Sequence, residues 1–118
     1  MPEPADGVQA QLAKLRRKYG LALPDKISGI EAACAPLSGG SWEESAVSAA
    51  YRQVHSLAGS SGTYGFPEIS SVARAAEAIL RQCLESRSLL APSQKAQVDG
   101  LLAKLREMAA AAAGQASA

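Results

Sequence analysis

Apolar residues recur at intervals of three and four along most of the chain, which is the spacing of amphipathic helices. The pattern predicts five helical segments: Asp6 to Gly20, Pro24 to Pro36, about Ser41 to about Thr63, Phe66 to about Glu85, and Ser93 to about Met108. The segments are joined by short connections, so we expect antiparallel neighbours. The predicted fold is therefore all-α, an antiparallel four-helix bundle with an additional N-terminal helix.

Local signals at the predicted breaks support this division. Gly20 is a stop for the first helix, and Pro24 suits the start of the second. Ser41 with Glu44 three residues later is typical of a capping box at the start of the central helix. Gly65 is a candidate for the left-handed turn that ends this helix. Ser93 is the predicted cap of the last helix, and Trp42 is expected to pack over one end of the bundle.

The length of the chain predicts a single domain over residues 1–118. We expect its core from about residue 21 to 108, followed by a low-complexity tail over 109–118. The formal net charge of +1 without a basic stripe argues against nucleic-acid binding. No apolar run is long enough to span a bilayer, and the N-terminus lacks a signal peptide, so we expect a cytoplasmic protein. Cys34 and Cys83 are expected to be buried thiols.

The end of the first predicted helix carries a cluster of positive charge: Lys14, Arg16, Arg17 and Lys18. Positive side chains favour the C-terminal end of a helix dipole, so a solvated helix end explains the cluster. A docking surface for an acidic partner is the alternative.

The chemistry concentrates around His55, the single histidine of the chain. At roughly 100° per residue, its side chain points away from an apolar stripe that includes Val47, Val54 and Leu57. The residues within roughly 60° of His55 are Ser48, Tyr51, Arg52, Ala58, Gly59 and Gly62. Glycine costs a helix about 1 kcal/mol relative to alanine, so two glycines on one face indicate that a partner approaches closely there. Metal binding is not expected, because no second histidine or carboxylate cluster accompanies His55.

The run from His55 through Gly59 to Gly65 and Phe66 resembles the signature of histidine-containing phosphotransfer (Hpt) domains. That signature has a phosphorylatable histidine, a glycine four residues later, small hydroxyl residues and a glycine ten residues later. The matching core covers roughly residues 41–85. Many members carry a lysine three residues after the histidine, where this chain has Ala58. Arg52, one turn before His55, is the candidate for supplying the positive charge instead.

The resemblance implies a phosphorelay carrier without catalytic activity of its own. His55 would accept a phosphoryl group and exchange it with the aspartate of a response-regulator receiver domain. A histidine kinase would act directly or through its receiver. No cofactor is expected, because Mg²⁺ would be on the receiver, and a monomer is sufficient. Two alternatives stay open: the phosphoryl-accepting domain of a chemotaxis-type histidine kinase, and a non-phosphorylated helical adaptor that docks a receiver.

Three hydroxyl residues after His55 are candidates for a lesser role. Ser61 falls on the buried side and is expected to bond a backbone carbonyl. Ser60 and Thr63 lie on the flanks, where a direct role in holding the phosphoryl group is less favoured. Glu77 and Arg81, on the following helix, fall largely away from its apolar stripe and are interpreted as solvated.

Overall fold

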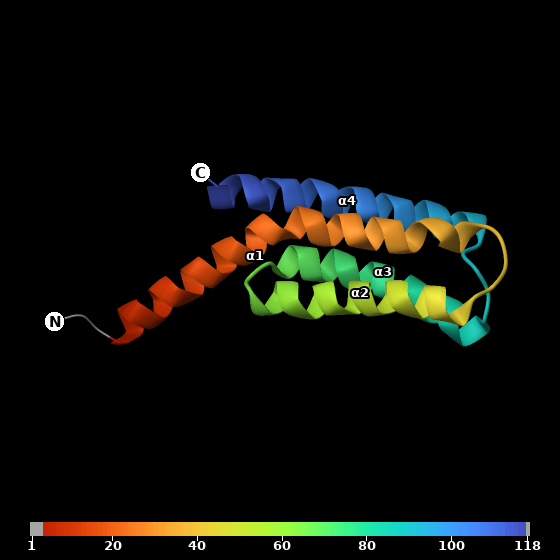
Figure 1. Cartoon of the computed structure of the whole chain (residues 1–118), viewed down its shortest axis with the longest axis horizontal. Helices are drawn as coiled ribbons and strands as arrows, with labels where there is room; N and C mark the ends of the chain where they lie inside the picture. The colour runs from red at the N-terminus through yellow and green to blue at the C-terminus, as the bar shows by residue number, and fades with distance from the viewer. Residues whose placement is uncertain (1–3, 118) are drawn as a thin grey trace.

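Antiparallel helices packed side by side account for nearly all of the chain (Figure 1). The computed structural model describes the backbone of residues 4–117 and the side chains from residue 7 to 117. Within this range it contains four α-helices and one short 3₁₀ turn: α1 (Pro4–Cys34), η1 (Ala35–Ser38), α2 (Glu44–Thr63), α3 (Pro67–Ser86) and α4 (Pro92–Ser117). The predicted four-helix bundle is confirmed.

The prediction of an additional N-terminal helix is wrong, because the first two predicted segments form the single helix α1. Gly20 does not stop it. A Cβ atom at this glycine would lie 3.4 Å from the carbonyl oxygen of Ala112, which is an ordinary contact, so α1 and α4 lie close enough that only a small residue fits between them. Pro24 lies inside the helix and removes only one backbone hydrogen bond, which tertiary packing can offset. The first part of α1 diverges from the bundle axis (Figure 1), as expected of a helix bent near a proline.

A polar contact between α4 and α1 lies just beyond the proline. Arg106 donates hydrogen bonds to the carbonyl oxygen of Pro24 at 3.2 Å and to the Ser28 hydroxyl at 2.8 Å. The same guanidinium forms an ion pair with Glu31. The contact fixes α4 along the second part of α1.

Several predicted helix ends shift by a few residues. α2 begins at Glu44, with Glu43 in the capping position and no side-chain cap, so the predicted capping box at Ser41 is wrong. α4 begins at Pro92, which places Ser93 inside the helix; the Gln94 side chain instead accepts a hydrogen bond from the Ala91 amide at 2.8 Å. These ends depend on short-range side-chain geometry, which sequence signals fix least well.

The turn between α2 and α3 forms as predicted. Gly65 has φ +88°, in the left-handed region that favours glycine. The amide of Phe66 then donates to the carbonyl oxygen of Ser61 at 2.7 Å, which satisfies a carbonyl at the end of α2. This turn makes α2 and α3 adjacent antiparallel helices (Figure 1).

Small side chains bring α2 and α3 close together. Ala58 and Ala73 are buried, and the buried Ser70 hydroxyl donates to the carbonyl oxygen of Ala58 at 2.7 Å. A Cβ atom at Gly62 would lie 3.4 Å from the Ser70 oxygen. The short spacing between these helices places residues of α3 within reach of side chains on α2, which is what builds the site.

The remainder of the core is aliphatic, and it extends into the C-terminal tail. Fully buried side chains include Leu23, Ile27, Val54, Leu80, Val98 and Leu105. Ala109 and Ala112 are also buried, so the tail belongs to α4 and packs against the bundle. Cys34 and Cys83 are buried free thiols, as predicted, and Trp42 packs partly buried against the core. None of the helices in the described part of the chain is both long and apolar enough to cross a membrane.

Candidate functional site: a histidine–glutamate pair between two helices

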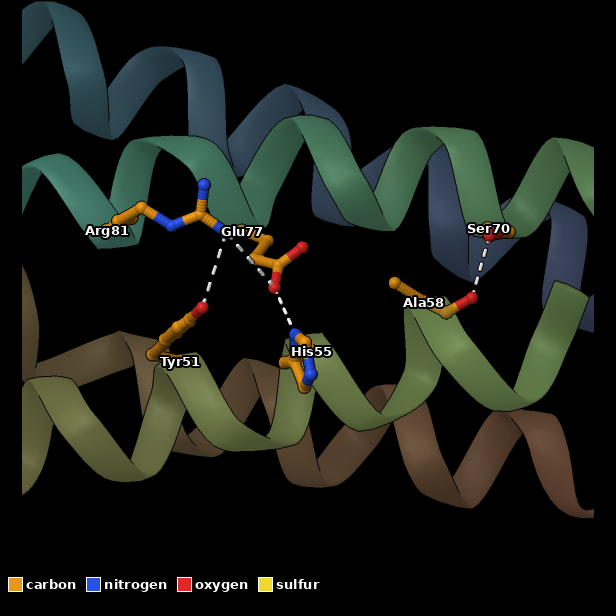
Figure 2. Close-up of polar contacts among 6 residues, drawn as sticks. All are labelled: Tyr51, His55, Ala58, Ser70, Glu77 and Arg81. Atoms are coloured by element: carbon orange, nitrogen blue, oxygen red, sulfur yellow. Dashed lines mark hydrogen bonds and ion pairs between the residues drawn. The ribbon is translucent and has the colours of Figure 1, made fainter.

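His55 lies in the middle of α2 with its side chain 66% exposed. The apolar side of α2 packs inward through Val54 and Leu57, which turns the imidazole outward at the edge next to α3. One ring nitrogen, Nδ1, is hydrogen-bonded to the Oε2 atom of Glu77 (Figure 2). The second nitrogen, Nε2, points away from Glu77.

Glu77 is the residue that the sequence interpretation placed wrongly. It is 4% exposed rather than solvated, and it lies on α3 directly opposite His55. The close approach of α2 and α3 covers its stem and leaves the carboxylate directed at the imidazole. A signal was present in the sequence: Glu77 lies four residues after the buried Ala73 and three before the buried Leu80, at the edge of the apolar stripe.

Arg81 and Tyr51 complete the surroundings of the carboxylate (Figure 2). A guanidinium nitrogen of Arg81, one turn along α3, lies 3.6 Å from Glu77 Oε2. It also donates to the Tyr51 hydroxyl at 3.3 Å. The Tyr51 ring in turn meets the His55 ring edge-on, with 5.8 Å between ring centroids. Tyr51 and Arg81 therefore limit the directions in which the Glu77–His55 pair can turn.

The environment favours the ionised form of Glu77. Burial by itself raises the pKa of this carboxyl group, but the hydrogen bond from His55 and the charges of His55 and Arg81 outweigh it, so the pKa lies below its usual value of 4.5. A carboxylate can only accept hydrogen bonds. Nδ1 of His55 must then be the protonated nitrogen.

The protonated Nδ1 determines what the other nitrogen can do. In a neutral imidazole one nitrogen carries the proton and the other carries a lone pair. With Nδ1–H bonded to Glu77, the lone pair is on Nε2, the nitrogen that faces away from the carboxylate (Figure 2). His55 is therefore presented as a nucleophile at an exposed position.

The face around His55 agrees with the sequence prediction at most positions. Arg52, Gly59 and Gly62 are exposed, and Ser48 and Tyr51 are partly exposed. Gly59 leaves open surface beside the ring, since nothing lies within 4 Å of a Cβ position there, whereas a Cβ at Gly62 would meet Ser70 of α3.

Ala58 is the exception, because it is 1% exposed. The helical angle placed it within the His55 face, but α3 covers that side of α2 through Ser70 (Figure 2). Arg52 lies on the opposite side of His55 from Ala58, so it does not occupy the place that a lysine at position 58 would have.

Next to this face runs a shallow groove of about 430 Å³ between α1 and α2. It is lined by Lys26, Ile30, Arg52, Gln53, Ser56 and Ser60, among others. Lys26 and Arg52 give it positive charge, while Ile30 is buried at its floor. The groove therefore presents two cations on the side of α2 next to the His55 face.

The hydroxyl residues after His55 bond to the protein itself. Ser61 is buried and donates to the carbonyl oxygen of Leu57 at 2.6 Å, as predicted. Ser60 shares a hydrogen bond with the Tyr19 hydroxyl, and Thr63 donates to the carbonyl oxygen of Gly59. Across the side chains from residue 7 to 117, no group of three or more metal-ligating residues is found.

Comparison with known families gives one match. The family model described as the Hpt domain matches residues 8–114, which is most of the chain. Neither the curated proteins nor the solved structures gave a match.

Proposed function

The chain belongs to the Hpt domain family, whose members serve as intermediates in histidine phosphotransfer, and we propose that His55 is the residue that carries the phosphoryl group. The observation that supports this best is the hydrogen bond from Nδ1 to the buried Glu77, which leaves the exposed Nε2 as the nucleophile. Family members interact in general with receiver domains and histidine kinases. We infer that the direct partner here is the receiver domain of a response regulator.

The transfer step needs only the groups described above and the receiver. The Nε2 lone pair attacks the phosphorus atom of an aspartyl phosphate, and an N–P bond forms as the P–O bond to the aspartate breaks. The aspartate carboxylate leaves with the electron pair, and no proton has to move. Positive charge develops on the imidazole ring, where the Glu77 carboxylate stabilises it at Nδ1. The reverse sequence of bonds returns the group to an aspartate.

The face around His55 is the proposed docking surface for the receiver. Gly59 leaves room beside the ring, and the exposed Gly62 lies farther along the same helix. Ser48, Tyr51 and Arg52 complete the surface. We propose that Arg52 contacts the phosphoryl group from the side of the α1–α2 groove, since the buried Ala58 offers no charge. Mg²⁺ and the catalytic carboxylates belong to the receiver, so the carrier contributes a nucleophile and a docking surface.

The test is phosphoryl transfer from a panel of phosphorylated receiver domains to this chain. The expected product is labelled protein whose label is lost in acid and retained in base, as for a phosphorylated histidine. His55→Gln should abolish the label while Ser56→Ala, an exposed neighbour, keeps it. Label that persists in His55→Gln would contradict the assignment. Complexes with a receiver that never yield label would instead favour an adaptor that only docks.

A further inference from the structure

A second feature of the molecule lies away from His55, at the projecting end of α1 (Figure 1). Every residue from Gly7 to Lys18 is exposed, while Tyr19 and the residues that follow it along the same side are buried. We call residues 7–18 the arm. The arm extends past the α2–α3 turn, so no other helix in the described part of the chain packs along its full length (Figure 1).

The apolar stripe of α1 continues unbroken into the arm. In the bundle it consists of Tyr19, Leu23, Ile27 and Ile30, which are 8%, 0%, 0% and 2% exposed. The same helical side carries Val8, Leu12 and Leu15 in the arm, which are 58%, 58% and 45% exposed. The stripe therefore has the pattern of a buried helix face, but its first half stays about half exposed among the described residues.

The arm differs from the rest of the chain in charge. Residues 7–24 contain four of the twelve Lys and Arg residues and none of the eleven Asp and Glu residues. At roughly 100° per residue, Arg16 and Lys18 lie on either side of the apolar stripe. Basic residues flanking an apolar seam match acidic residues at the flanks of a partner helix.

The base of the arm borders a groove as well as carrying positive charge. A groove of about 530 Å³ lies where the arm meets the α2–α3 turn and the end of α4, lined by Leu12, Arg16, Tyr64, Phe66 and Ala112, among others. The Tyr19 ring stacks on Tyr64 with 4.7 Å between centroids, and the Arg16 guanidinium lies 5.1 Å from the centre of the Phe66 ring. These ring contacts place aromatic side chains, Tyr64 and Phe66, along the groove.

We propose that the arm docks an acidic amphipathic helix of a partner protein, whose apolar residues cover Val8, Leu12 and Leu15 and whose carboxylates pair with Arg16 and Lys18. A second copy of this chain fits less well, because pairing two arms would bring eight cations together with no acidic residue between them. The proposed function of His55 is not required for this interaction.

The experiment uses two synthetic helical peptides of about three heptads, with Leu at positions a and d. One carries Glu at positions e and g, and the other carries Lys. Binding to the full chain is measured by fluorescence anisotropy at low and high salt. We expect the Glu peptide to bind at least about tenfold more tightly than the Lys peptide, with the difference shrinking as salt screens the charges.

Four variants locate the binding site. Leu12→Ser combined with Leu15→Ser should weaken binding of the Glu peptide at least about tenfold, because the apolar contacts are lost. Leu21→Ser is the matched control, since Leu21 is 50% exposed but lies on the opposite side of α1. Lys18→Glu should weaken the Glu peptide and strengthen the Lys peptide. His55→Gln should leave binding of both peptides unchanged.

Two outcomes would overturn the proposal in favour of another occupant. Sedimentation is measured on the same proteins: a dimer that dissociates in the Leu12→Ser, Leu15→Ser protein would assign the arm to a second copy. Binding to vesicles of anionic phosphatidylglycerol, with neither peptide binding, would assign it to a membrane surface. Equal affinity for the Glu and Lys peptides would also refute it, because the arm's charge would then have no role.

Discussion

Replacing Glu77 by Gln tests whether the carboxylate, rather than the side chain's shape, prepares His55 for phosphoryl transfer. The amide has nearly the same volume, so the packing between α2 and α3 is retained. Its oxygen can still accept from Nδ1, but the hydrogen bond loses its charge and the amide N–H₂ can compete by donating to Nδ1. In that second arrangement the proton is on Nε2, and the nucleophilic lone pair no longer faces the partner.

The size of the effect follows from the difference between charged and neutral hydrogen bonds. A hydrogen bond to a charged group contributes about 1.5–3 kcal/mol, and a neutral one about 0.5–1.5 kcal/mol. The substitution exchanges a charged hydrogen bond for a neutral one, and a loss of about 1.4 kcal/mol corresponds to a tenfold change in rate. We therefore expect Glu77→Gln to slow transfer from a phosphorylated receiver by about tenfold, with receiver binding nearly unchanged because Glu77 is 4% exposed.

The assay is single-turnover transfer from one phosphorylated receiver, with receiver affinity measured separately on the unphosphorylated pair. Glu107→Gln is the matched control, since Glu107 is exposed on α4 and its substitution changes the net charge of the protein by the same amount. A wild-type transfer rate in a folded Glu77→Gln protein would refute the argument. An equal loss of transfer rate in Glu107→Gln would also refute it, because the net charge of the protein and not the Glu77–His55 pair would then set the rate.

Stability gives an independent measure of the same contact. The pKa of Glu77 in the folded protein lies below its usual value of 4.5, so the carboxylate stabilises the fold above that pH. This contribution is lost as the pH falls through the folded-state pKa. The difference in free energy of unfolding between wild type and Glu77→Gln should therefore be largest near neutral pH and shrink below pH 4.5 in urea titrations. A difference that grows as the pH falls would contradict the lowered pKa.

Three further predictions concern the bundle. Gly20→Ala should leave the free energy of unfolding unchanged or raise it by up to about 1 kcal/mol, because alanine favours the helix and the added Cβ makes ordinary contacts. Gly20→Leu should lower the free energy of unfolding by about 1–3 kcal/mol, because the larger side chain forces α1 away from α4. Urea unfolding distinguishes the two variants, and equal values would contradict the close approach of the helices. Leu80→Ala should cost about 2–5 kcal/mol in the same assay, since Leu80 is fully buried, and a cost below 1 kcal/mol would be inconsistent with that. Burial raises the pKa of Cys34 to about 11, so its thiol should react with a disulfide reagent far more slowly at about pH 8 in the folded protein than in urea; equal rates would show that the thiol is accessible.

The outward position of His55 and the helices α2 and α3 could be predicted from the sequence, because their signals are local. Apolar spacing identifies α2 and α3, and the glycine at position 65 has the positive φ that its place after the helix suggested. The helical angle correctly turned His55 outward, since the buried positions Val54 and Leu57 fix the opposite side. Each of these conclusions depends on residues within one helix or one turn.

Apart from the helix caps at Ser41 and Ser93, the errors involve a second helix. Gly20 and Pro24 carry the local marks of a helix end, yet α1 continues through both because α4 packs against it and Gly20 allows the close approach. Ala58 has an angle that places it beside His55, but α3 covers that side. Local propensity is a weak prior that tertiary contacts override, and the helical angle does not say where a neighbouring helix lies.

Glu77 shows how the same limitation conceals half of a site. An acidic residue at the edge of an apolar stripe is buried only if a partner compensates its charge, since burying an unpaired carboxylate is costly. The position of Glu77 between Ala73 and Leu80 therefore implies a cationic or hydrogen-bonding partner on the facing helix, and Figure 2 places the imidazole of His55 there. Arg81 adds a compensating charge at 3.6 Å. The proposed nucleophile is thus prepared by the folding of the bundle itself, because the packing that buries Glu77 is also what fixes the proton on Nδ1.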